Sequence, residues 1–65
     1  MPLAQISIAA GRSPEAITRM AKAVSAAIAE SLDAPLETVR VLVTEVSADR
    51  WFAGGDSLRD RQTRT

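Results

Sequence analysis

Two short stretches of alternating side chains, with one helical pattern between them, constrain this fold most. The first stretch, LAQISIAA, covers residues 3–10, and the second, VRVLVTEV, covers residues 39–46. In each stretch, side chains of similar character recur at every second position, which is typical of a strand with two different faces. The second stretch is also rich in β-branched valines, which favour strands. We therefore predict one strand in each stretch.

Residues 13–32 carry the signals of a helix. Ser13 is a capping residue, Pro14 suits the first helical position, and Glu15 brings a negative charge to the positive end of the helix dipole. Apolar residues then recur at helical spacing, at Ile17, Met20, Ala21, Val24, Ala27, Ile28 and Leu32. We predict an amphipathic helix that begins near Ser13.

The helix is expected to stop at Asp33 and Pro35, which favour a turn. The order is then strand, helix, strand, and a helical crossover of this length predicts two parallel neighbouring strands joined in the right-handed sense. The following segment, SADRWFAGGD, indicates a loop or short hairpin, and residues 59–65 read as a polar, arginine-rich mobile tail. We predict a single α/β domain over residues 1–58.

Such a fold is incomplete as a monomer. A two-stranded parallel sheet with one helix leaves one face and both edges uncovered. A domain of 65 residues buries only about 60% of the surface of its unfolded chain. The chain has no cysteine and no histidine, which excludes disulfides, thiol chemistry and the usual structural zinc sites. We therefore expect an obligate homo-oligomer, because self-association is the remaining source of stability.

The charge balance bears on partners. Eight basic and eight acidic residues cancel, so no overall field attracts nucleic acid or an anionic membrane. No segment approaches the ~20 apolar residues that span a bilayer. We expect a cytoplasmic protein with neither nucleic acid nor membrane as a partner.

Pro2 is the first candidate for chemistry. Removal of Met1, which is usual before a small residue, would turn its amide nitrogen into a free secondary amine. An ordinary α-amino group has a pKa of about 7.7–8.0, and apolar surroundings or nearby cations lower it. A neutral amine can act as a general base in a chain without histidine. The alternative is a proline that is merely tolerated at a strand start.

Arg12 and Arg40 are candidates for anion binding. Arg12 follows the first predicted strand, where open α/β sheets tend to bind ligands. Arg40 enters the second strand, where it needs a partner or a solvent-lined cavity. Its alternatives are plain exposure or a salt bridge to Glu37 or Glu45. Two guanidinium groups facing one pocket would suit a dicarboxylate or a 2-oxo acid.

Trp51 is the third candidate. It lies in the segment after the second strand, directly before Phe52. A lone tryptophan in a small domain usually packs in a core or an interface. Beside a proline amine, it would instead form an apolar wall that excludes water.

Together these features resemble the 4-oxalocrotonate tautomerase family. The resemblance covers residues 1–58 and rests on Pro2, GRS after the first strand, SLDAPLETVRV before and into the second, and TEV followed by an aromatic residue and GG. It implies a β-α-β tautomerase fold with a short C-terminal hairpin, completed by oligomerisation into hexamers that are trimers of dimers.

The resemblance also implies a cofactor-independent isomerase of aromatic hydrocarbon catabolism. Enzymes of this kind convert 2-hydroxy-2,4-dienoates such as 2-hydroxymuconate to conjugated 2-oxo acids, without a metal. By resemblance Pro2 is the general base and Arg12 holds a distal carboxylate. Arg40 of a neighbouring subunit binds the 2-oxo acid end, and Trp51 forms the apolar wall. Phe52 stands where the best-known members carry glycine, which leaves the substrate open.

Two other functions remain open from the sequence. Within the superfamily, a proline amine also activates water or forms an imine, as in hydratases, dehalogenases and decarboxylases. Outside it, the chain could be a non-catalytic oligomeric binding protein whose arginine-rich tail touches an acidic partner.

Overall fold

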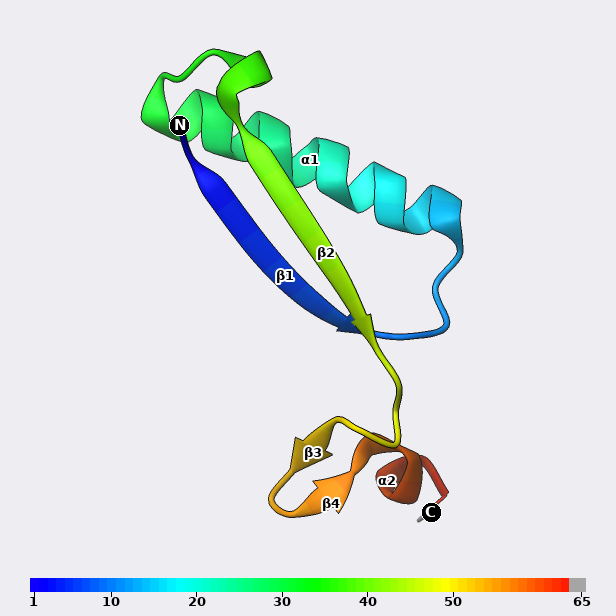
Figure 1. Ribbon diagram of the computed structural model, residues 1–65. Coiled ribbons are helices and arrows are strands. Elements are labelled where there is room, and N and C mark those ends of the chain that lie inside the picture. The colour runs from blue at the N-terminus through cyan, green and yellow to red at the C-terminus, as the bar shows by residue number, and fades with distance from the viewer. Residues whose placement is uncertain (64–65) are drawn as a thin grey trace.

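The computed structural model describes residues 1–63 and consists of a β-α-β unit followed by a small hairpin and a short helix (Figure 1). The elements are β1 (Leu3–Ala9), α1 (Pro14–Leu32), the 3-10 turn η1 (Leu36–Thr38), β2 (Arg40–Val46), β3 (Phe52–Ala53), β4 (Asp56–Ser57) and α2 (Leu58–Thr63). This order confirms the predicted α/β fold with its C-terminal hairpin.

The two long strands pair in parallel. Leu3 lies opposite Arg40 and Ala9 lies opposite Val46, so the strands are paired along their full length. Side chains on one face are half-buried, and those on the other are mostly exposed. The half-buried face meets α1, since Ile8 and Val41 each line a hollow together with helix residues. The other face is left uncovered by the described residues 1–63, because α1 lies on one side of the strands (Figure 1).

Helix α1 begins and ends where the sequence predicts. The Ala16 amide donates to the Ser13 hydroxyl over 3.1 Å, which caps the first turn. At the other end, Asp33 adopts a left-handed conformation with φ of 52°, and Ala34 N–H donates to the Ala29 carbonyl over 3.0 Å. These bonds satisfy groups that a helix end leaves without partners.

The C-terminal segment forms a compact unit of its own. Gly54 and Gly55, with φ of 62° and 90°, make the two-residue turn between β3 and β4. Tight hairpins favour positive φ at both positions, and glycine adopts it without steric cost. Residues 59–63 continue as helix α2, which differs from the mobile tail expected from residue 59. Residues 64 and 65 lie outside the described part of the chain.

The chain buries very little by itself. Within residues 1–62, only Val39 and Ser57 are buried, whereas Leu3, Leu42 and Phe52 are each more than half exposed. The radius of gyration is 15.0 Å, compared with about 11 Å for a compact domain of this length. An isolated protomer therefore lacks the core that a stable domain needs. No helix in this described part is long and apolar enough to cross a membrane.

Candidate active site

Pro2 lies immediately before β1 and beside the start of β2. It is half-buried, and its carbonyl accepts the Arg40 amide N–H over 2.9 Å. The ladder thus uses the carbonyl that proline retains rather than the N–H that it lacks. Proline is compatible with this strand start, and the sheet fixes its position.

Arg40 is the first residue of β2 and is exposed on the uncovered face of the sheet, with Leu3 opposite. Its Nη1 donates to the Glu37 carbonyl over 2.8 Å and contacts the Val39 carbonyl at 3.5 Å. Among residues 1–63 its partners are therefore main-chain carbonyls, not the carboxylates of Glu37 or Glu45 that the sequence offered. Because strand side chains alternate, Pro2 belongs to the opposite face.

Arg12 lies in the turn between β1 and α1. It is exposed and lines a hollow whose other lining residues are Ile8, Ala16, Ile17 and Met20. A guanidinium beside an apolar surface suits a ligand that carries both a carboxylate and a hydrocarbon chain.

Trp51 lies between β2 and β3, in the C-terminal unit. The residue is half-buried, and its carbonyl accepts the Leu58 N–H over 2.8 Å. The neighbouring Phe52 side chain is 60% exposed. The two aromatic residues therefore differ in environment, although they are adjacent in the chain.

One chain does not bring these four residues together. Pro2 and Arg40 lie where the parallel strands begin, whereas Arg12 and Trp51 follow the ends of β1 and β2. The seven residues of β1 separate the two ends by about 23 Å at the usual rise of a strand. Both guanidinium groups can therefore face one pocket only if different subunits supply them.

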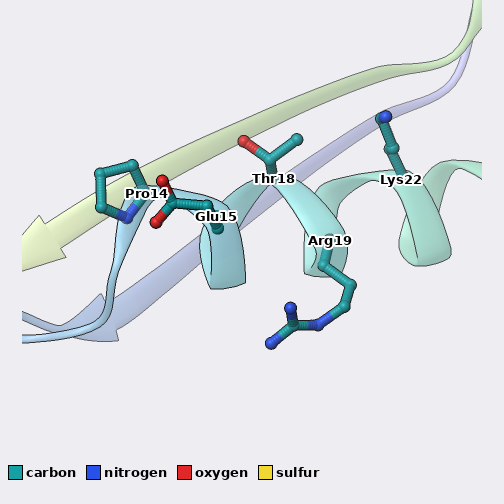
Figure 2. A pocket seen from close by; sticks show the side chains of 5 residues that line it. All are labelled: Pro14, Glu15, Thr18, Arg19 and Lys22. Carbon is teal, nitrogen blue, oxygen red and sulfur yellow. The ribbon is translucent and has the colours of Figure 1, made fainter.

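A further hollow lies on the surface of α1 and contains none of the predicted residues. Figure 2 shows its lining residues, Pro14, Glu15, Thr18, Arg19 and Lys22, all from this one helix. Arg19 points away from the strands in this view. The described residues also hold no group of three or more histidine, cysteine, aspartate or glutamate side chains suited to a metal ion.

Comparison with known proteins identifies the family. A family model described as tautomerase enzyme matches residues 2–61. The chain belongs to the tautomerase family. A 2-hydroxymuconate tautomerase of Stutzerimonas stutzeri is 48% identical over 59 residues, which cover 91% of this chain and 94% of that protein. These relatives confirm the resemblance drawn from the motifs and make the chain a tautomerase, an isomerase.

Solved structures agree in fold. TomN, a 4-oxalocrotonate tautomerase homologue of the tomaymycin biosynthetic pathway, superimposes with a TM-score of 0.92 at 41% identity and covers 94% of each chain. A heterohexamer 4-oxalocrotonate tautomerase from Chloroflexus aurantiacus superimposes with a TM-score of 0.89 at 40% identity, and the match covers 92% of this chain and 97% of the other.

The structure of this tautomerase also contains polar contacts that the sequence interpretation missed. The Ser57 hydroxyl accepts the Asp60 N–H over 3.2 Å, and Arg59 forms an ion pair with Asp49. The sequence contains a signal for the contact between Ser57 and Asp60, because a serine followed three residues later by an acidic residue is typical of a helix start. This helix signal was missed because the C-terminal segment is polar and shows no apolar face that could pack against the rest of the chain.

Proposed function

We propose that this tautomerase converts a 2-hydroxy-2,4-dienoate such as 2-hydroxymuconate to the conjugated 2-oxo acid, with Pro2 as the general base. The observation that carries the proposal is the 48% identity to a 2-hydroxymuconate tautomerase over 91% of this chain. The half-buried position of Pro2 at the start of the sheet supports it.

The proposed reaction moves one proton. Once Met1 is removed, the Pro2 nitrogen takes the proton from the 2-hydroxyl group, and the electrons of the O–H bond form the C=O bond. The dienol double bonds shift, and the amine returns the proton to carbon, so no atom is gained or lost. Only the neutral form of the amine can accept this proton.

The two arginines bind and polarise the substrate in this proposal. Arg40 of a neighbouring subunit binds the 2-oxo acid end and stabilises negative charge on the enol oxygen, while Arg12 holds the distal carboxylate. Main-chain carbonyls hold Nη1 of Arg40. Within residues 1–63, its Nε and Nη2 remain available to an anion. Trp51 supplies an apolar wall.

We further propose that the active form is a homo-oligomer, a hexamer built as a trimer of dimers. The uncovered sheet face and the small core support self-association. If a two-fold axis relates the sheets of two copies, the strands of the two copies run in opposite directions. The beginning of the strands in one copy then lies beside the ends of the strands in the other, which would bring Pro2 towards Arg12 and Trp51 of another copy. One related structure is that of a heterohexamer.

Replacement of Pro2 and Arg40 tests the proposal. Pro2→Ala leaves a primary amine, and Arg40→Ala removes the guanidinium, so each should lower kcat/KM for 2-hydroxymuconate about 10²-fold or more. Arg19→Ala, an exposed arginine on the outer side of α1, should behave like the parent protein. Intact mass should show that Met1 is absent from the active protein. Parent-like turnover in both site variants, or retention of Met1 in active protein, would refute the assignment.

A further inference from the structure

We propose that Ser57 is a positioning residue that fixes Trp51 by capping α2, an inference that rests on the proposed role of Trp51 as a wall of the active site. Ser57 is the one polar residue that is buried within residues 1–62, with 8% of its surface exposed. It lies at the junction between β4 and α2. A buried hydroxyl needs a protein partner, because water cannot easily replace the lost hydrogen bond.

Helix α2 depends on this cap because it is short. It has six residues, whereas isolated helices under about 12–15 residues are marginal in water. The Ser57 hydroxyl accepts the Asp60 N–H over 3.2 Å, which satisfies one of the amide groups that the first turn leaves without a helical partner. Loss of the hydroxyl therefore favours unfolding of α2.

The first residue of α2 is bonded to Trp51. The Leu58 N–H, which has no acceptor within its own helix, donates to the Trp51 carbonyl over 2.8 Å. In the hairpin, Ser57 itself pairs with Phe52, the residue after Trp51. The junction between β4 and α2, which Ser57 caps, therefore fixes the position of the Trp51 backbone.

The second residue of α2 holds the loop that leads to Trp51. The Arg59 N–H donates to the Ala48 carbonyl over 3.3 Å, and the Arg59 side chain forms an ion pair with Asp49. The loop before Trp51 and the carbonyl of Trp51 are therefore both bonded to the first turn of α2. If α2 unfolds, these contacts are lost together and Trp51 becomes mobile.

Ser57→Val and Ser57→Thr form a matched pair for the test. The two replacements have almost the same shape, but only threonine keeps the hydroxyl acceptor. Trp51 is the only tryptophan in the chain, so its fluorescence anisotropy and quenching by acrylamide report its order directly. In Ser57→Val we expect faster quenching, lower anisotropy and a roughly 5-fold higher KM, the factor that corresponds to a cap worth about 1 kcal/mol. The kcat should stay within about two-fold, because the proposed base lies elsewhere.

Ser57→Thr should restore the parent behaviour in all of these measurements. Equal quenching and equal KM in the two variants would overturn the proposal. A parent protein that shows no turnover of 2-hydroxymuconate would refute the proposed function instead, while the fluorescence comparison would still test the positioning.

Leu58→Pro and Leu58→Ala provide an independent pair if Ser57→Val does not fold. Proline is favoured at the first position of a helix but lacks the N–H that Trp51 accepts, whereas alanine keeps it. We expect faster quenching in the proline variant than in the alanine variant. Identical quenching in this pair would also contradict the proposal.

Discussion

The Arg40 guanidinium contacts main-chain carbonyls rather than a carboxylate. The identity of these partners determines which ligands the guanidinium can bind. A carboxylate partner would neutralise its charge, whereas a carbonyl orients the group and leaves the charge for an anion. The sequence predicted that Arg40 needs a partner. It could not distinguish the Glu37 carboxylate from the Glu37 carbonyl, because that choice depends on the path of η1.

Replacement of Arg40 by lysine tests whether substrate binding needs the planar guanidinium group or only its positive charge. Lysine keeps the positive charge but cannot hold a carbonyl and a carboxylate in the same planar arrangement. We expect Arg40→Lys to retain some activity and to lose roughly 10-fold in kcat/KM, which is less than the loss in Arg40→Ala. Steady-state kinetics with 2-hydroxymuconate give kcat/KM for the parent protein, Arg40→Lys and Arg40→Ala, and so measure the two losses. Equal losses in the lysine and alanine variants would mean that charge at this position contributes nothing.

Trp51 provides a second prediction for a single residue. If the ring is an apolar wall, Trp51→Phe keeps most of its surface and should raise KM only about two-fold, whereas Trp51→Ala should raise KM at least about 10-fold through lost contact area. Parent-like KM in Trp51→Ala would remove this residue from the site.

The elements were predictable to the extent that their signals are local. Both ends of α1 follow from Ser13, Pro14 and Asp33, and the alternation in β1 and β2 correctly divides the sheet into two faces. Helix α2 was not predicted, because one leucine followed by five polar residues shows no apolar periodicity. Its contacts are with Trp51 and Asp49, which lie in the segment between β2 and β3 and leave no signal in the sequence of the helix itself.

The turn between β3 and β4 gives a prediction for an element. Gly54 has φ of 62°, and a Cβ added there would meet nothing within 4 Å, so only backbone strain opposes a side chain. Gly54→Ala should therefore destabilise the hairpin by about 1 kcal/mol, while Gly54→Asn should be nearly neutral because asparagine is favoured in this turn. Urea unfolding followed by Trp51 fluorescence measures the difference. Equal stability of the two variants would show that the hairpin does not limit unfolding.

At the scale of the whole molecule, the small core and the uncovered sheet face support the proposed assembly with other subunits. The sequence predicted this dependence from the order of elements, but not which side chains would remain exposed. Leu3 and Leu42 now mark the open face, with 56% and 53% of their surfaces exposed. The distribution of the proposed site residues over both ends of the sheet also favours assembly if they form one site, since the strand between the two ends spans about 23 Å.

Leu42 therefore tests the link between assembly and activity. Leu42→Lys places a charge on the open face, so burial of this face between subunits would leave the charge without water or a partner. We expect sedimentation to show smaller species and the thermal midpoint to fall. Turnover should decrease together with assembly, although Pro2, Arg12 and Arg40 are unchanged. Leu42→Met, which nearly conserves volume, should assemble and react like the parent. Full assembly of the lysine variant would exclude this face from the interface, and full activity of a dissociated monomer would contradict a site shared between subunits.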